Sequence, residues 1–414
     1  MTAVAREPRR QISTPVGTLE VRLGQTTVGT LARLQNDATL FVFDPEYVED
    51  NNRPTLSLGY KGRDGNLVQN VRPTRTKLPT FFSNLLPEGH LRQYLAARGA
   101  VHPDREFFLL WLVGADLPGA VVAAASDGAL PPRAEGEEPT HAEEERPLRF
   151  SLAGVQLKFS AVMETSGGLT LPVGGVGGDW IAKLPSPRYN SVPETEYAMM
   201  TLAAAVGVQV PEVRLVPTAE IGDLPSGLPE RFGQTLAVRR FDRTEGGERI
   251  HIEDFAQVFN RYPDDKYGKA SYSNIAEVLW AETGEVGASE FVRRLVFNVL
   301  IGNGDAHLKN WSLIYPDRRT PALAPAYDLV GTVAFIQHDR LALSLGGTKE
   351  FGEVDIDRLR SFAEKAGLPT RAVLKIASET AHAVRDLWPQ HEPVRALPDS
   401  IREAIESHMK TIRL

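Results

Sequence analysis

The sequence contains no cysteine. This absence excludes disulfide bonds, thiolate metal sites and a cysteine nucleophile, and it fits a protein of the reducing cytoplasm. Long apolar runs are missing as well: the best one, residues 107–122, is broken by Gly114, Asp116 and Pro118, whereas a membrane span needs about 18 continuous apolar residues. The charged residues at 1–11 are not followed by an apolar core, so we expect no secretory signal, no membrane segment and a cytoplasmic location.

Net positive charge is also lacking, because 46 Lys and Arg stand against 53 Asp and Glu, a formal charge of −7 at pH 7. The chain as a whole therefore has no electrostatic attraction for nucleic acid or an anionic membrane, although a local basic patch is not excluded. What is present is ordinary for a folded globular protein, with 42% hydrophobic and 24% charged residues. The 414 residues exceed the usual size of a single core, so we expect two or three subdomains.

Residues 1–125 have the pattern of a small α+β unit, a β-rich N-terminal subdomain. Alternating apolar residues over 18–34 predict a hairpin, and residues 39–44 predict a further strand. Apolar residues at helical spacing, followed by glycines, predict helices within 78–100 and 103–114.

The chain beyond this unit divides into three parts. Residues 126–146 are rich in Pro, Gly, Glu and Ala and predict a flexible acidic linker. Residues 147–250 predict a kinase-like N-lobe with ATP-binding elements, made of strands and one amphipathic helix (148–163, 169–173, 179–184, 192–207 and 234–242). Residues 251–414 are almost entirely helical in pattern and predict a C-lobe with the catalytic loop. The expected fold class is α+β, a protein-kinase-like bilobal fold with a β-rich N-terminal subdomain and an all-helical C-terminal lobe.

The stretch GNGDAHLKNW, residues 302–311, follows an apolar run that has helical spacing. Phe291, Leu295 and Val299 recur every four residues and predict one apolar helix face, and Gly302 can end that helix. Asp and Asn beside glycines are common turn formers, so the loop taken alone is explained equally well as a capping turn.

A catalytic interpretation rests on the spacing inside this loop. Asp305 and Asn310 are five residues apart, the spacing of the base and the metal-binding amide in the protein-kinase catalytic loop. Asp328, in PAYDLVGTV, adds a second carboxylate, and carboxylate and amide oxygens suit Mg²⁺. His307 alone is more often structural than a proton carrier. Taken together, G-D-x-H-x-x-N with a downstream Asp resembles the loop shared by phosphoinositide kinases, aminoglycoside phosphotransferases and the HipA family.

Lys183 lies in the alternating stretch WIAKL and is followed by Glu194 and Glu196 at the start of a predicted helix. A strand lysine paired with a helix glutamate is how kinases hold the α- and β-phosphates. Either glutamate could serve, and a surface lysine on an edge strand is the alternative. The glycines of 171–180 match no phosphate-binding motif and predict a hairpin. We prefer residues 151–158 for phosphate contact, since their small residues allow close backbone approach.

These motifs resemble those of HipA-type toxin kinases, in the same order and from about residue 14 to the C-terminus. The stretches that carry the resemblance are FFSNLLPEGHLRQ, GADLPGAV, FSLAGVQLKFS, WIAKLP, ETEYAMMTLAAAVG, AVRRFDR, HIEDFAQVF, LIGNGDAHLKNWSL, PAYDLV and LALSLGG. The resemblance implies an ATP- and Mg²⁺-dependent serine/threonine protein kinase, the toxin of a type II toxin–antitoxin pair. The implied substrate is an aminoacyl-tRNA synthetase, typically the glutamyl enzyme, with growth arrest and persistence as the outcome. The implied partner is a HipB-like helix-turn-helix antitoxin, through which the complex binds operator DNA.

The resemblance also implies roles for individual residues. Asp305 would be the catalytic base, and Asn310 and Asp328 would hold Mg²⁺. Ser151 would be autophosphorylated, which adds roughly −1.5 to −2 charges beside the loop that must cover ATP. The other nucleotide-binding residues implied are Ala153, Gly154, Val155, Gln156, Leu157 and Lys158 of the phosphate loop, Lys183, the hinge residues Arg239, Arg240 and Phe241, and His307, Lys309 and Tyr327.

The sequence departs from the family pattern at two places, and two other functions remain as alternatives. The hinge has Arg239 where the resemblance leads us to expect an acidic residue, and the linker at 126–146 is long and acidic. A small-molecule phosphotransferase would share the G-D-x-H-x-x-N loop, but no marker of its substrate pocket is evident. A non-enzymatic corepressor that only supports the antitoxin would be expected to have lost part of the set Lys183, Asp305, Asn310 and Asp328, which is intact.

Overall fold

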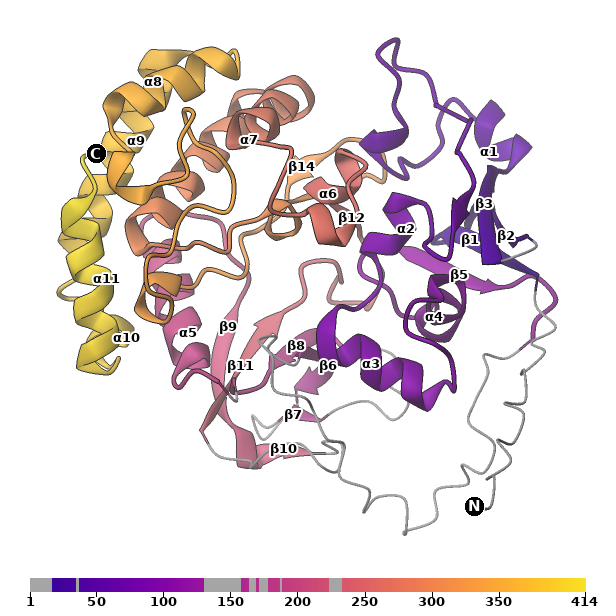
Figure 1. Ribbon diagram of the computed structural model, residues 1–414, viewed down its shortest axis with the longest axis horizontal. Helices are drawn as coiled ribbons and strands as arrows, with labels where there is room; N and C mark the ends of the chain where they lie inside the picture. The colour runs from indigo at the N-terminus through magenta and orange to yellow at the C-terminus, as the bar shows by residue number, and fades with distance from the viewer. Residues whose placement is uncertain are drawn as a thin grey trace, which may run out of the picture.

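The computed structural model describes residues 17–34, 37–129, 158–163, 169–170, 178–186, 188–222 and 233–414. The side chains of His90, Tyr94, Arg98 and Phe159 are not among those described. The predicted autophosphorylation site and most of the predicted phosphate loop lie outside the described residues, as does the predicted linker beyond residue 129: Ser151, Ala153, Gly154, Val155, Gln156, Leu157 and 130–146. Figure 1 shows the N-terminal subdomain at one end of the molecule and the C-terminal helices at the other.

The N-terminal subdomain is a five-stranded antiparallel sheet in the order β4-β3-β2-β1-β5, with helices on one face. The predicted hairpin of residues 18–34 is confirmed, and Gly24 takes the positive φ of 58° that its tight turn needs. The helical stretch 78–100 is two helices, since Pro87 interrupts the pattern between them. The elements are β1 (Thr18–Leu23), β2 (Thr26–Arg33), β3 (Ala38–Phe43), α1 (Pro45–Glu49), β4 (Thr74–Arg75), α2 (Thr80–Asn84), α3 (Gly89–Arg98), α4 (Glu106–Val113) and β5 (Val121–Ala125).

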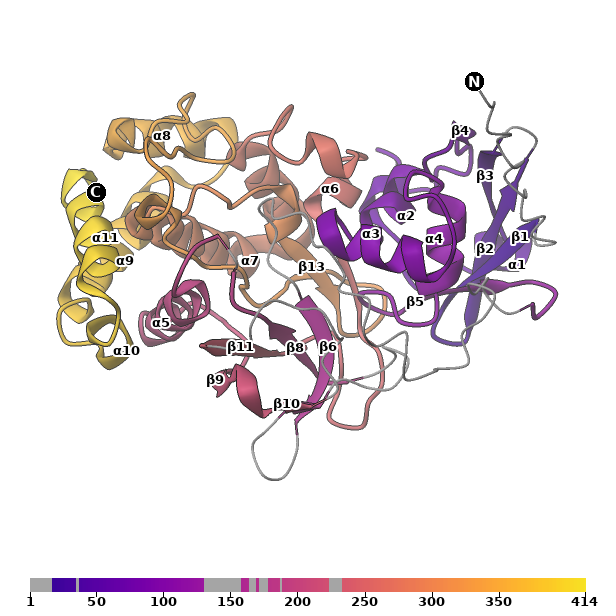
Figure 2. The ribbon, with the colours of Figure 1, turned by 60° about the horizontal axis from the view of Figure 1, so that its bottom comes forward.

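Helices α2, α3 and α4 lie on the side of this sheet that faces the rest of the chain, as both views show (Figures 1 and 2). Phe41 and Phe82 pack with ring centroids 4.8 Å apart, which joins the sheet to α2 inside one apolar core. Helix α2 in turn contacts α6 of the C-terminal lobe. The helical layer therefore forms part of the contact between the subdomain and the rest of the protein.

The middle of the chain forms a six-stranded sheet in the order β10-β7-β6-β8-β11-β9, with one long helix, α5, packed against it. Strand β8 pairs antiparallel with both β6 and β11, so that Lys183 lies opposite Lys158 of β6 on one side and opposite Leu236 of β11 on the other. The elements are β6 (Lys158–Met163), β7 (Leu169–Thr170), β8 (Trp180–Lys183), α5 (Val192–Ala205), β9 (Val213–Pro217), β10 (Ile221–Gly222) and β11 (Gln234–Arg239).

The C-terminal lobe is built around α7, which begins at a capping box formed by Ser271 and Asn274 and ends at Gly302 in the left-handed conformation. The predicted helix end at Gly302 is thus confirmed. Gly284 interrupts α7 with φ 64° and ψ −154°, so that two helices meet there. The helices are α6 (Phe255–Val258), α7 (Tyr272–Ile301), α8 (Ile356–Lys365), α9 (Thr370–Leu387), α10 (Glu392–Arg395) and α11 (Asp399–Thr411).

The lobe is helical as predicted, with one correction: it also contains a short antiparallel sheet, β12-β13-β14. All four residues of β13 are buried, so the alternation that would have marked a strand is absent from its sequence. The three strands are β12 (His251–Asp254), β13 (Ser312–Tyr315) and β14 (Ala322–Leu323). Short 3-10 turns connect the elements: η2 (Leu58–Tyr60), η3 (Thr218–Glu220), η4 (Pro263–Asp265), η5 (Leu308–Asn310), η6 (Thr332–Ala334) and η7 (Phe351–Glu353). Among the described residues, no helix is both long enough and hydrophobic enough to span a bilayer.

Candidate active site

Lys183, the last residue of β8, extends into the space between the six-stranded sheet and α5. Its ammonium forms an ion pair with Glu196, and both side chains are almost completely buried. Glu194 stands only two residues earlier and therefore points to a different side of α5, which decides the choice that the sequence left open. Burial alone lowers the pKa of Lys183, but the nearby charges of Asp328 and Glu196 outweigh it and raise that pKa above its ordinary value.

Asp328 is the point where two lysines meet. Its carboxylate forms an ion pair with Lys183 and a second one with Lys158, whose Nζ lies 2.9 Å from Oδ2. Burial raises the pKa of Asp328, yet the two ammonium groups together hold it well below its usual range. The residue also has a positive φ of 55°, a backbone strain that native structures tolerate mostly at functional sites. Asp328 is therefore an ionised carboxylate held by Lys158 at the start of β6 and by Lys183 at the end of β8.

The loop after α7 is tied to Asp328 by Asn303, whose side chain is 1% exposed. The Asn303 amide donates to the backbone oxygen of Asp328 at 3.1 Å and to Oδ1 of Asn298 at 2.7 Å, while its own oxygen accepts from the backbone N–H of Asp305 at 3.0 Å. Asn310 closes the loop, since its Nδ2 donates to the backbone oxygen of Asp305 at 2.7 Å. Sequence reasoning missed Asn303, although it lies between the two glycines of the motif.

The Asp305 carboxylate is 53% exposed and so can be reached from solvent. One of its oxygens accepts a 2.5 Å hydrogen bond from the hydroxyl of Tyr267, and Nε2 of His307 lies 3.9 Å from the same oxygen. Burial lowers the pKa of His307 to about 4, so this imidazole is neutral at pH 7. Its ring meets the edge of the Tyr267 ring at 4.9 Å. The loop thus presents an accessible carboxylate beside a neutral, buried histidine.

The predicted hinge begins at Arg239, the last residue of β11, and the side chains and backbone N–H groups of its arginines pair with residues outside the hinge. The guanidinium of Arg239 pairs with Glu212 at 3.5 Å, and that of Arg240 is buried against Asp242 at 2.8 Å. Their backbone N–H groups donate to Glu212 and to Asp179. Phe241 is the hinge residue that contacts the site, with its ring 5.7 Å from that of Tyr327.

Two of the remaining predicted residues have their partners on other elements. The hydroxyl of Tyr327 lies 2.5 Å from Oγ of Ser312 and donates to the backbone oxygen of Lys309 at 2.9 Å. The ammonium of Lys309 lies 2.6 Å from Glu88 of the N-terminal subdomain. Lys309 therefore faces that subdomain, and Glu88 is a neighbour of the loop that sequence reasoning did not find.

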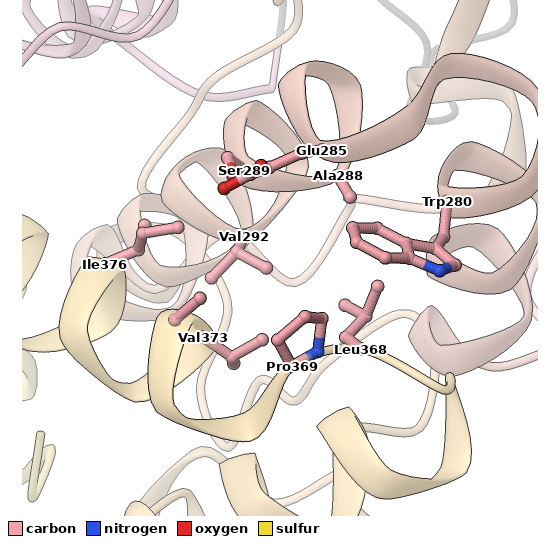
Figure 3. Close-up of a pocket in the computed structure, with 10 residues that line it drawn as sticks. Trp280, Glu285, Ala288, Ser289, Val292, Leu368, Pro369, Val373 and Ile376 are labelled. Carbon is pink, nitrogen blue, oxygen red and sulfur yellow. The ribbon is translucent and has the colours of Figure 1, made fainter.

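Two hollows can be compared with this site. One of about 320 Å³ is lined by the hinge together with residues 211–212 and 243–245. Another, of about 20 Å³, lies between α7 and α9 with Trp280 at one end and Ile376 at the other (Figure 3). The second has room for about one water and includes no predicted site residue, so it is not a ligand site of consequence. The described residues hold no group of three or more His, Asp or Glu side chains fit for a metal ion, so Asn310 and Asp328 would need further ligands from a nucleotide and water.

A β-rich lobe and a helical lobe, with a strand lysine paired to a helix glutamate and facing an aspartate loop, define the protein-kinase-like class of folds. Comparison with family models narrows the class. The HipA-like C-terminal domain matches residues 150–388, and the HipA N-terminal domain matches residues 19–124. The chain belongs to the HipA family of kinases.

Individual relatives agree with this assignment. A protein from Sinorhizobium fredii named "Putative kinase Y4dM" is 50% identical over 96% of this chain and 98% of its own length. The serine/threonine-protein kinase toxin HipA of Shewanella oneidensis is 26% identical over 95% of this chain and 94% of its own. A solved structure of the Shewanella oneidensis toxin–antitoxin complex of HipA, HipB and operator DNA matches with a TM-score of 0.72 at 22% identity, covering 95% of this chain and 97% of that one. The predicted fold class is confirmed, and kinase activity is supported in general terms.

Proposed function

We propose that this protein is a serine/threonine protein kinase toxin that uses Mg-ATP to phosphorylate a protein hydroxyl. The observation that carries the proposal is the convergence of three functional groups. Lys183 is held by Glu196 and Asp328, and Asn303 ties the backbone of Asp328 to that of Asp305. Phosphoryl transfer needs a cation on the phosphates, oxygen ligands for a metal and a carboxylate for the attacking hydroxyl, and this set supplies one of each.

In the proposed reaction, Asp305 orients the substrate hydroxyl and accepts its proton. The hydroxyl oxygen forms a bond to the γ-phosphorus while the bond between that phosphorus and the oxygen of ADP breaks. Asp305 suits this role because its carboxylate is 53% exposed. His307 is neutral at pH 7 and does not draw the base into a strong ion pair. Lys183 holds phosphate oxygens, and Phe241, packed against Tyr327, borders the adenine site.

The residues fit a magnesium ion by the chemistry of their donors. Asp328 offers a carboxylate that stays ionised, and Asn310 offers an amide oxygen, both of them hard oxygen ligands. Mg²⁺ held there would neutralise charge on the phosphate oxygens during transfer. Lys158, 41% exposed, is the partner of Asp328 that can move aside for it, whereas Lys183 is buried.

The finer parts of the proposal rest on family resemblance. We propose that the kinase acts as a toxin by phosphorylating an aminoacyl-tRNA synthetase, typically the glutamyl enzyme, and so causes growth arrest and persistence. Autophosphorylation of Ser151 would switch it off. The Shewanella oneidensis relative forms a complex with HipB and operator DNA, which supports a HipB-like helix-turn-helix antitoxin as the partner here and contact with operator DNA through it.

The proposal is tested by incubating the wild type and Asp305→Asn with Mg-ATP, followed by intact mass measurement and phosphopeptide mapping. We expect phosphate on Ser151 in the wild type alone. Asp264→Asn is a matched control, since Asp264 is an exposed carboxylate that pairs only with Lys77 among its described ion pairs, and it should behave as wild type. If the wild type transfers phosphate neither to itself nor to any of a panel of purified synthetases, the protein-kinase proposal is wrong. The corepressor and small-molecule functions would then be the ones to pursue.

A further inference from the structure

Glu88 lies in the N-terminal subdomain, at the start of α3, and yet it contacts the candidate catalytic loop. One carboxylate oxygen is 2.6 Å from Nζ of Lys309, and the other is 2.7 Å from Nζ of Lys266. Both lysines belong to the C-terminal lobe. Burial raises the pKa of Glu88, but the two ammonium groups prevail and lower it to about 2. The carboxylate is therefore ionised at neutral pH.

Further contacts join the segment around Glu88 to the C-terminal lobe. The ammonium of Lys309 also donates to the backbone oxygen of Asn84, at the end of α2, at 3.2 Å. The side chain of Asn84 donates in turn to the backbone oxygen of Arg261 at 2.7 Å. The side chains of Lys309 and Lys266 are 15% and 21% exposed, so both lysines have little freedom to move away from Glu88. The segment around Glu88 thus holds the C-terminal lobe at several adjacent points.

Each of the two lysines belongs to a segment that is joined to the candidate base. Lys309 is in η5, four residues after Asp305. Lys266 directly precedes Tyr267, whose hydroxyl donates to the Asp305 carboxylate at 2.5 Å. The backbone oxygen of Lys266 also accepts from the N–H of Leu308 at 3.2 Å, which joins the two segments directly. One carboxylate of the N-terminal subdomain therefore restrains both segments that surround the base.

We propose that Glu88 is a positioning residue for Asp305, so that the N-terminal subdomain supplies part of the geometry of phosphoryl transfer. The inference rests on the proposed function. Transfer depends steeply on the placement of the base, and a shift of about 1 Å can cost about a hundredfold in rate. Lys183 and the hinge have other partners, and Lys309 is the predicted nucleotide-binding residue that pairs with Glu88. The effect of Glu88 should accordingly be larger on turnover than on the affinity for ATP.

The test compares Glu88→Gln with Glu282→Gln. Glu282 on α7 forms a bridge of the same kind, 2.7 Å from Lys61 of the N-terminal subdomain, without contacting the loop through any described bond. We expect Glu88→Gln to lower kcat for phosphotransfer roughly tenfold with KM for ATP within about twofold, Glu88→Asp to recover part of the loss, and Glu282→Gln to match the wild type. Amide hydrogen exchange over residues 305–310 should quicken in Glu88→Gln alone.

Phosphotransfer kinetics and hydrogen exchange together distinguish a failure of the positioning role from a failure of the proposed function. Unchanged kcat together with unchanged exchange in Glu88→Gln would overturn the positioning role. A rise in KM for ATP equal to the loss of kcat/KM would also overturn it, because the effect would then be on binding. If the wild type transfers no phosphate at all, the proposed function fails, and hydrogen exchange alone still decides whether Glu88 holds the loop. Thermal unfolding of all three variants identifies any that do not fold.

Discussion

Replacing Lys183 by methionine is the sharpest test of the charge arrangement in the candidate site. The ammonium is shared between Glu196 and Asp328, and the side chains of Lys183 and Glu196 are 4% and 2% exposed. Methionine has a similar length but no charge, so Lys183→Met leaves Glu196 buried without its partner and near a second carboxylate. Breaking a buried ion pair on one side costs about 3–5 kcal/mol. We expect the free energy of unfolding to fall by about that amount, together with a loss of ATP binding.

The double variant Lys183→Met/Glu196→Gln distinguishes the stability effect from the functional one. Because it removes both buried charges, it should recover part of the lost stability, by about 1–3 kcal/mol, without recovering ATP binding. Lys375→Met is the matched control, since within the described part of the chain Lys375 forms only an exposed helix pair with Glu379 at 3.8 Å, and such pairs contribute less than about 0.5 kcal/mol. Denaturant unfolding gives the stabilities, and calorimetry gives the nucleotide affinity.

The reasoning is refuted if Lys183→Met unfolds within about 1 kcal/mol of the wild type, a cost typical of a surface pair. It is also refuted if the double variant is less stable than the single one, because Glu196 would then not be an unpaired charge in Lys183→Met. Retention of ATP binding in either variant would contradict the role of Lys183 on the phosphates while leaving the structural argument intact.

Two further predictions concern other buried groups. Asn303→Ala removes three hydrogen bonds at a side chain that is 1% exposed. We therefore expect urea unfolding to show about 3 kcal/mol lower stability and single-turnover kinetics to show a phosphotransfer rate reduced tenfold or more. A wild-type rate would contradict the link between Asp305 and Asp328. His251 is buried and its pKa is lowered to about 4 by burial, while the unfolded chain protonates near 6.5. Its contribution to stability is therefore fully present above pH 6.5 and is lost, by about 3 kcal/mol, as the pH falls from about 6.5 to 4. His251→Gln should flatten this part of the curve, whereas an unchanged curve would assign the acid sensitivity to other groups.

Local patterns in the sequence predicted the parts of the fold that depend on local physics. The hairpin of residues 18–34 and the helix end at Gly302 are confirmed, because alternation, helical spacing and a left-handed glycine each act within a few residues. Strand β13 was missed since burial on both faces removes the alternation. The break between α2 and α3 was missed although Pro87 marks it.

The site divides in the same way. Lys183 and Asp305 could be selected from spacing and residue type, and their catalytic roles stay predictions. The choice of Glu196 over Glu194 required the direction of side chains on α5 relative to β8, which no spacing rule supplies. Glu88 could not be found at all, since it is 221 residues from Lys309 and its own surroundings contain no catalytic pattern. Contacts of this kind are set by how whole elements dock.

Such docking contacts gather at the segments that matter most for the proposed chemistry. Asp242, just after the hinge, accepts from the backbone N–H of Gly119 at 2.8 Å and is 5% exposed. Glu253, 1% exposed at the start of the C-terminal lobe, accepts from the backbone N–H of Leu58 at 2.9 Å. Together with Glu88, these are carboxylates whose hydrogen bonds cross between the N-terminal subdomain and the lobes. The pKa values of Glu88 and Asp242 are lowered, so these two are ionised, whereas burial raises the pKa of Glu253 to about 7. A buried carboxyl group of either form is costly to leave without its hydrogen-bond partners. The subdomain is therefore bound to the hinge and the loop by buried polar contacts, and a chain lacking it would not be expected to keep either in place.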